Sequence, residues 1–323
     1  MKAIVVSEFG PESVLHYVDA PVPEPKEGEV LVRMEAVGVN PVDTYIRSGA
    51  YGAVPSLPYT PGEDGAGVID KVGPGVQGVS PGDRVWVAAA YAKRSTGSYA
   101  EFMACDAEAT QPLPDSISFS EGAGLGIPGQ AAASALFTRA KMKPGETVLV
   151  HGATGGVGTL AVQLARRSGA KVVGTAGSEE GLKVVRDLGA HHVFNHHDQD
   201  YMQKIAGAVS PGGIDVVVEM LANVNLAKDL SLIAKNGRIV IVGSRGSVDF
   251  NPRDTMAKNA AIFGMLVKNM SYEQYRMNMF RLKAGLETGL KVLVGGELPL
   301  EHASVAHQRV LGDKQPGKIV LRP

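Results

Sequence analysis

The fold is decided by the stretch Val148-Leu149-Val150-His151-Gly152-Ala153-Thr154-Gly155-Gly156-Val157-Gly158. An apolar, β-branched run ends in a cluster of glycines and then continues, from Thr159 to Arg166, with the apolar periodicity of a helix. This order predicts a buried strand, a tight turn and a helix. Glycines let the backbone approach a pyrophosphate closely, and the first helical turn offers unpaired N–H groups and the positive end of its dipole. We therefore expect a dinucleotide site here.

The glycine pattern departs from G-x-G-x-x-G at one position. Ala153 stands in the place of the first glycine, Gly155 and Gly158 are in place, and Gly156 is additional. Taken alone, the stretch is also compatible with a close-packed strand-to-helix turn that binds nothing.

The composition is that of an ordinary globular protein. A chain of 323 residues exceeds the usual size of one core and predicts two domains. With a net charge of -1, no overall field attracts nucleic acid or an anionic membrane. The beginning of the chain does not resemble a signal peptide and no apolar run reaches membrane-spanning length, so we expect a cytoplasmic protein.

The single cysteine, Cys105, excludes an internal disulfide and a multi-thiolate zinc cage. Its strand-like surroundings favour a small buried residue over a nucleophile.

Two kinds of predicted secondary structure follow one another along the chain. Residues 2–125 are β-rich, with Pro/Gly turns between alternating runs, and predict a small barrel-like antiparallel domain. Residues 125–145 contain an alanine-rich helical segment at 131–141. From residue 147 strands and helices alternate, which predicts a parallel, doubly wound sheet. The closing run at 317–321 is expected to be a strand that returns to the first domain.

The end of the second strand of that sheet indicates the cofactor. An NAD site places an acidic residue there, but this strand ends in Ala176-Gly177-Ser178 with no carboxylate before Glu179. A free N–H and a hydroxyl at this point favour the 2′-phosphate of NADP, with His196 and Arg245 as candidate cationic partners. The spacing of the neighbouring histidines favours solvated loop residues over metal ligands.

Several strings together resemble one family. They include Gly38-Val39-Asn40-Pro41-Val42-Asp43-Thr44-Tyr45, Pro61-Gly62-Glu63-Asp64-Gly65-Ala66-Gly67, the glycine stretch above, Glu219-Met220-Leu221-Ala222-Asn223-Val224-Asn225 and Val242-Gly243-Ser244-Arg245-Gly246. The chain resembles, over nearly its whole length, the zinc-free, zeta-crystallin-like quinone oxidoreductases of the medium-chain dehydrogenase/reductase superfamily.

The resemblance implies an α/β fold. Residues 1–125 and 267–323 would form a GroES-like β-rich catalytic domain, and residues 126–266 an inserted Rossmann domain that binds NADPH. It also implies a cytoplasmic setting and a homo-oligomer, a tetramer or a dimer. Zinc-dependent relatives hold their catalytic metal with cysteine and histidine at the positions of Asn40 and Glu63, so no metal is expected.

The expected NADPH contacts come from the resemblance, except Ser178, which comes from its hydroxyl at the phosphate position. They are Tyr45, Thr154, Gly155, Gly156, Val157, Gly177, Ser178, His196, Asn225, Val242, Gly243, Ser244 and Arg245. For several of these residues a structural role is the alternative: a packed aromatic for Tyr45, a helix cap for Asn225 and a surface ion pair for Arg245.

The expected reaction is NADPH-dependent reduction of quinones. A quinone is already electrophilic, so the protein mainly has to position the nicotinamide and exclude water. Asn40 and Tyr45 are candidate contacts of the substrate carbonyl, Asp43 is expected to stabilise a turn, and no obligate general acid is assigned.

Two other functions stay open. One is reduction of the C=C bond of enones, which gains support from small residues at 129–134, where the family usually has an aromatic and a threonine. The other, RNA binding or a structural crystallin role, is associated with the family but has no support from the net charge of -1.

Overall fold

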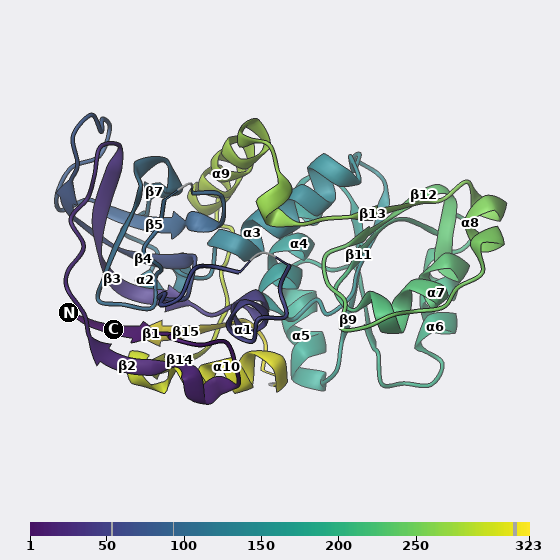
Figure 1. Cartoon of the computed structure of the whole chain (residues 1–323). Helices are drawn as coiled ribbons and strands as arrows, with labels where there is room; N and C mark the ends of the chain where they lie inside the picture. The colour runs from purple at the N-terminus through teal and green to yellow at the C-terminus, as the bar shows by residue number, and fades with distance from the viewer. Residues whose placement is uncertain (53, 93, 313–314) are drawn as a thin grey trace. The chain divides into compact units, whose positions relative to one another are not determined.

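The computed structural model describes residues 1–323 except 53, 93 and 313–314, and its chain divides into two compact units. Unit 1 consists of Met1–Ile127, Leu282–Thr288 and Val292–Pro323, and unit 2 of Pro128–Arg281 and Gly289–Lys291. In Figure 1 the chain begins in unit 1 in purple and blue. It continues through unit 2 in teal and green and returns to unit 1 in yellow.

Unit 1 is built mainly of strands. These are β1 (Lys2–Val5), β2 (His16–Asp19), β3 (Glu29–Gly38), β4 (Asp64–Val72), β5 (Arg84–Ala88), β6 (Phe102–Asp106), β7 (Thr110–Pro112), β14 (Val294–Pro299) and β15 (Lys318–Arg322). Its helices are α1 (Pro41–Arg47), α2 (Phe119–Gly122) and α10 (Ala303–Gly312).

The main sheet of unit 1 has seven strands in the order β14-β15-β3-β4-β5-β7, with β6 also paired to β3. All of its pairs are antiparallel except β14 with β15. The closing strand β15 pairs with β3 through Val320 opposite Gly38, which confirms the expected return. Apolar side chains on one face of β3, Val30, Val32 and Met34, are buried in the core of the unit.

Unit 2 contains the alternating strands and helices. Its strands are β8 (Thr147–Val150), β9 (Lys171–Ala176), β10 (His192–Asn195), β11 (Ile214–Glu219), β12 (Ile233–Ile241) and β13 (Ala261–Gly264). The helices are α3 (Gly126–Ala133), α4 (Gly156–Arg167), α5 (Glu179–Asp187), α6 (Tyr201–Val209), α7 (Ala222–Leu232), α8 (Pro252–Lys258) and α9 (Tyr272–Glu287), of which α3 begins and α9 ends within unit 1.

The six strands of unit 2 form one parallel sheet in the order β10-β9-β8-β11-β12-β13. The order reverses between β8 and β11, and ligands of such sheets bind at this point, outside the carboxyl ends of the strands. The central strands β8 and β11 are apolar because helices cover both faces of a parallel sheet; Val148, Leu149 and Val217 are fully buried. The predicted fold class is confirmed.

Two details differ from the expectations. The helix expected at 131–141 begins earlier, at Gly126, and continues as a π-helix over Ser134–Arg139. Residues 267–281, expected in the first domain, belong to unit 2 because the α9 side chain of Asn278 and the preceding Met270 are bonded to Ser134. Among the described residues, no helix combines the length and the apolar character needed to cross a bilayer.

Gly158 sets the approach of α4 to the loop before it. A Cβ at this position would lie 2.3 Å from the carbonyl oxygen of Gly152 and 2.7 Å from the Cα of Ala153. Both neighbours are backbone atoms, so any side chain forces the loop or the helix to move.

Gly158→Ala should therefore lower the free energy of unfolding by about 1–3 kcal/mol, as overpacking does. The matched control is Gly207→Ala in α6, where a Cβ meets nothing within 4 Å and the exposed helix gains propensity. Urea denaturation of the two variants measures the contrast; equal stability would contradict the role of Gly158.

Candidate functional site

The expected cofactor residues of unit 2 come together at the carboxyl edge of the parallel sheet. The segments that follow β8, β9, β10, β11 and β12 all begin there, because parallel strands present their carboxyl ends on the same edge. They bring Thr154, Gly155, Gly156, Val157, Gly177, Ser178, His196, Asn225, Val242, Gly243, Ser244 and Arg245 to one edge of the sheet. Tyr45 lies on α1 of unit 1.

The loop between β8 and α4 has the features of a phosphate-binding turn. Gly155 is the N-cap of α4 and offers no side chain to the first helical turn, so the N–H groups of that turn are available to a ligand. A Cβ at Gly155 would meet only the carbonyl oxygen of Gly152, at 3.6 Å. The backbone here therefore leaves room for a pyrophosphate.

The end of β9 carries a hydroxyl where NAD sites carry an acid. Ser178 is the N-cap of α5 and accepts a hydrogen bond of 3.1 Å from the backbone N–H of Gly181. The serine hydrogen is still available to an acceptor such as a phosphate oxygen. Gly177 lies directly against the imidazole of His196, since a Cβ on this glycine would be 2.9 Å from His196 Nε2.

His196 and Arg245, the two candidate partners of a 2′-phosphate, differ in charge. Partial burial, followed by the nearby His197 and His151, lowers the pKa of His196, so this imidazole is neutral near pH 7 and acts as a hydrogen-bond donor. Arg245 is exposed, and its backbone N–H donates to Asn223 Oδ1 at 2.9 Å. The Arg245 guanidinium carries the positive charge that the neutral imidazole lacks.

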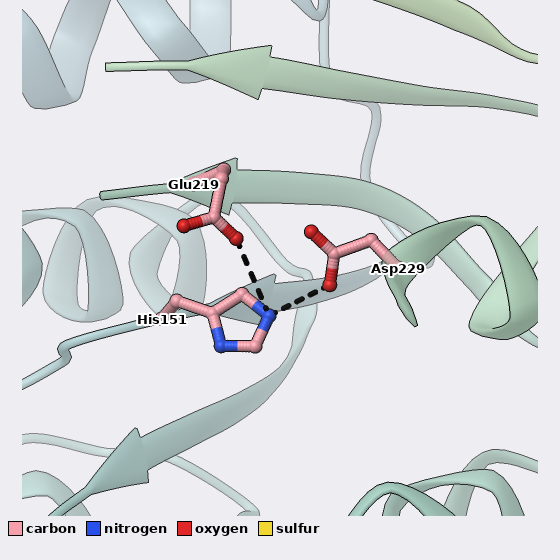
Figure 2. A group of neighbouring side chains, drawn as sticks. All are labelled: His151, Glu219 and Asp229. Atoms are coloured by element: carbon pink, nitrogen blue, oxygen red, sulfur yellow. Dashed lines mark hydrogen bonds and ion pairs between the residues drawn. The ribbon is translucent and has the colours of Figure 1, made fainter. Parts of the chain in front are cut away.

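Beneath these loops lies a buried group that the sequence did not reveal, formed by His151, Glu219 and Asp229 and drawn in Figure 2. His151 Nε2 lies 2.8 Å from Asp229 Oδ1 and 3.6 Å from Glu219 Oε2. His151 is the first loop residue after β8, Glu219 ends β11, and Asp229 is on α7. The sequence offered one signal for this group: Glu219, an acidic residue, directly follows the apolar run Val216-Val217-Val218.

In unit 1, Asn40 belongs to a buried network of charges. Its Nδ2 donates to Asp64 Oδ2 at 2.8 Å, and its Oδ1 accepts from Lys318 Nζ. Lys318 is also 3.3 Å from Asp64, whose other oxygen accepts the backbone N–H of Ile127 at 2.7 Å. Asn40 is only 2% exposed, and both ends of its amide are engaged.

A second buried chain of groups adjoins this network. Asp43 Oδ2 accepts the backbone N–H of Asn40 at 2.8 Å and the hydroxyl of Tyr99 at 3.1 Å. Tyr99 in turn lies 3.1 Å from His307 Nε2 on α10. Asp43 thus closes a capping box at the start of α1, a role close to the expected stabilisation of a turn.

Comparison with known proteins assigns both units. Residues 26–115 match the model of the alcohol dehydrogenase GroES-like domain, and residues 156–282 match the model described as zinc-binding dehydrogenase. The chain is 48% identical to a quinone oxidoreductase of Rattus norvegicus and 47% identical to one of Homo sapiens, in each case over 99% of this chain and 97% of the relative. It belongs to the zinc-free quinone oxidoreductases of the medium-chain dehydrogenase/reductase superfamily.

Solved structures agree with this family. Quinone oxidoreductase of Escherichia coli complexed with NADPH has a TM-score of 0.88 and 28% identity and covers 100% of each chain. A mycobacterial protein complexed with NADPH has a TM-score of 0.89 and 31% identity, again over 100% of each chain.

Within this zinc-free family, the positions that hold zinc in other dehydrogenases carry different chemistry here. Asn40 and Glu63 provide neither thiolate nor imidazole, and the amide of Asn40 is bonded to a lysine and an aspartate. Cys105 is buried in β6, and burial raises the pKa of its thiol to about 12, so it is not a reactive nucleophile.

The small residues at 129–134 are core residues of unit 2. Gln130, Ala132 and Ala133 are fully buried, and Asn278 on α9 donates to both Gln130 Oε1 and Ser134 Oγ at 3.1 Å. The departure from the family pattern therefore coincides with a buried polar contact to α9.

The Asp43 and His307 side chains have opposite pKa shifts. Burial raises the pKa of Asp43 from 3.8 to about 7, opposed by the Asn40 N–H and Lys318. Burial and then the charge of Arg47 lower the pKa of His307 from 6.5 to about 3. Between about pH 4 and 6.5 the folded pair holds one proton, on Asp43, and the unfolded pair also holds one, on the histidine, so the two pH slopes of stability cancel.

Single substitutions should reveal the two opposing slopes. In Asp43→Asn only His307 titrates in this range, and it binds its proton more strongly in the unfolded state. The free energy of unfolding should therefore rise with pH between about 3 and 6.5. In His307→Gln only Asp43 titrates in this range, and it binds its proton more strongly in the folded state. The free energy of unfolding should therefore fall with pH between about 4 and 7. Each slope approaches at most about 1.4 kcal/mol per pH unit. Urea denaturation across this range measures both; slopes of the same sign in the two variants would contradict the assignment.

Proposed function

We propose that this chain reduces quinones with NADPH and without a metal ion. The observation that carries the proposal is the match, at 47–48% identity over 97% of their length, to relatives named quinone oxidoreductase. The acid-free end of β9 and the zinc positions without thiolate or imidazole agree with it. The cofactor is NADPH, as in the solved complexes of family members.

The residues present fit this cofactor. The N–H groups at the start of α4 suit the pyrophosphate, and the hydroxyl of Ser178 with the side chains of His196 and Arg245 suits the 2′-phosphate. When bound, NADPH supplies the hydride or electrons for the reduction.

The remaining chemistry falls to positioning. Reduction of a quinone gives an aromatic, stabilised oxyanion, so the protein needs to orient the substrate and exclude water rather than to donate a proton in an obligate step. Tyr45, half-buried on α1, is our proposed hydrogen-bond donor to the substrate carbonyl. Asn40, held at both ends by Asp64 and Lys318, is proposed to keep its one remaining amide hydrogen for the same carbonyl.

Steady-state NADPH oxidation over a panel of ortho- and para-quinones tests the function. We expect turnover with quinones and preference for NADPH over NADH. Product analysis with an enone separates the alternative: a saturated ketone formed faster than any quinone is reduced would place the chain with enone reductases.

Ser178→Asp tests the 2′-phosphate site without removing the helix cap, because aspartate caps helices as well as serine. The added carboxylate should repel the 2′-phosphate and raise the KM for NADPH about tenfold, with a much smaller effect on NADH. Ser178→Thr is the neutral control that keeps cap and hydroxyl. An unchanged ratio of the two KM values in Ser178→Asp would argue against this position for the phosphate.

Tyr45→Phe tests the proposed substrate contact. Loss of the hydroxyl should lower kcat/KM for quinones about tenfold, the effect of one hydrogen bond of about 1.4 kcal/mol, while the Kd for NADPH changes less. Tyr17→Phe on the exposed strand β2 is the control. Equal kcat/KM in the wild type and Tyr45→Phe would remove this residue from the mechanism.

Homo-oligomerisation and a cytoplasmic location stay predictions. The first is supported by β13, which is an edge strand of the six-stranded sheet, because an edge strand can pair with a strand of a second copy. Light scattering coupled to gel filtration measures the oligomeric state.

A further inference from the structure

The group His151, Glu219 and Asp229, here called the buried trio, is almost completely shielded from water. His151 is 2% exposed, and Glu219 and Asp229 are fully buried. Burying two carboxyl groups and one imidazole is costly unless their charges are balanced and their hydrogen bonds completed. The trio therefore needs a physical reason to persist.

Proton counting shows how the trio is balanced. With an imidazolium and two carboxylates its net charge is −1, and Glu219 Oε2 and Asp229 Oδ2 have no hydrogen-bond partner. One proton shared by the two carboxyl groups would give a neutral trio and join the two unpartnered oxygens. The 2.8 Å distance from His151 Nε2 to Asp229 Oδ1 is that of a charge-assisted hydrogen bond.

The trio also bonds to residues at the carboxyl edge of the parallel sheet, where the expected cofactor residues lie. Glu219 Oε1 accepts from the backbone N–H of Leu221 at 2.5 Å and from Asn225 Nδ2 at 3.2 Å. Because the Asn225 amide donates inward, its Oδ1 is available to a ligand.

His151 connects the trio to the end of β9 and to the glycine loop. Its Nδ1 is 3.4 Å from Thr175 Oγ1, which accepts the backbone N–H of Gly152 at 3.2 Å. The trio thus connects the glycine loop, the end of β9 and the start of α7.

We propose that the buried trio is a proton-sharing positioning unit for NADPH: in its neutral form it holds the glycine loop and the Asn225 amide in the arrangement that binds the dinucleotide. The proposal rests on the assignment of NADPH to this edge. His151, Glu219 and Asp229 act through Gly152 and Asn225 and are positioning residues rather than catalytic ones.

The pKa shifts agree with a shared proton. Burial raises the pKa of Glu219 to about 7, opposed by His151 and reinforced by Asp229. Burial lowers the pKa of His151, but the hydrogen bond and charge of Asp229, together with the charge of Glu219, outweigh burial and raise this pKa. Above about pH 7 the trio becomes an anion beneath a site for phosphates, so NADPH binding weakens.

Other groups face the trio from the elements around it. Lys228 on α7 acts on His151, Tyr201 on α6 is affected by both carboxyl groups, and His196 after β10 is affected by His151. The 2′-phosphate also titrates, near pH 6. These groups are present in every variant compared below, so a difference between variants isolates the trio.

The test is the Kd of NADPH, measured by fluorescence titration without quinone, between about pH 6 and 8.5. Glu219→Gln mimics the protonated acid: its oxygen can accept from Leu221 and Asn225 and its amide can donate to Asp229. We expect the wild-type Kd to rise several-fold across this range more than that of Glu219→Gln. Asp229→Ala, which breaks the trio, should raise the Kd about tenfold at every pH and change kcat at saturating NADPH by less than about twofold.

Glu146→Gln is the matched control. Glu146 pairs with Arg238 at 2.8 Å, at the opposite edge of the same sheet, so its loss should lower the melting temperature and leave the Kd for NADPH unchanged.

Three results would overturn the proposal: the same pH slope in the wild type and Glu219→Gln, a wild-type Kd in a folded Asp229→Ala, or one equivalent of metal per chain that is lost in Asp229→Ala. If Asp229→Ala does not fold, the comparison with Glu219→Gln still decides. Because binding is measured without quinone, absence of quinone turnover would count against the proposed function and leave this test intact.

Discussion

The close packing of α4 against the loop that follows β8 is the constraint on which the cofactor site depends. The helix can begin beside the loop only because Gly158 has no side chain, with the Gly152 carbonyl oxygen 2.3 Å from where a Cβ would be. This approach directs the unpaired N–H groups of the first helical turn to the edge of the sheet where the segments after β9, β10, β11 and β12 also begin. The glycine pattern and the proposed phosphate site therefore depend on the same close approach.

Buried charge stabilises each unit in a different way. In unit 1 Lys318 contacts both Asn40 and Asp64, so a lysine ammonium provides the positive charge among these buried oxygens. In unit 2 the charge of the buried trio is balanced by a shared proton in our proposal. The network in unit 1 is held by hydrogen bonds, and in our proposal the shared proton joins the two unpartnered carboxyl oxygens of the trio.

Much of the fold could be predicted from the sequence because local patterns determine it. The apolar run before the glycines predicts β8 and α4, and the alternation of strand and helix after residue 147 predicts the parallel, doubly wound sheet of unit 2. The missing acid after β9 also pointed to NADP from local chemistry alone, and Ser178 proved to be a helix cap at that place. The sequence shows that residue 158 is a glycine, but the close approach of this residue to Gly152 is seen only in the structure.

The rest depends on contacts between residues far apart in the chain. His151 and Asp229 are separated by 78 positions, and Asn40 and Lys318 by 278, so no periodicity relates them. The engagement of both ends of the Asn40 amide, and the bonding of Ser134 to α9, likewise exist only after folding. The position of residues 267–281 in unit 2 follows from the same α9 contacts.

A crystal structure of this chain with NADPH tests the central claim most directly. The account predicts the pyrophosphate at the N–H groups that begin α4, and the 2′-phosphate in contact with the Ser178 hydroxyl and with His196 or Arg245. A pyrophosphate bound away from the β8–α4 loop, or a 2′-phosphate that touches none of these three side chains, would contradict it.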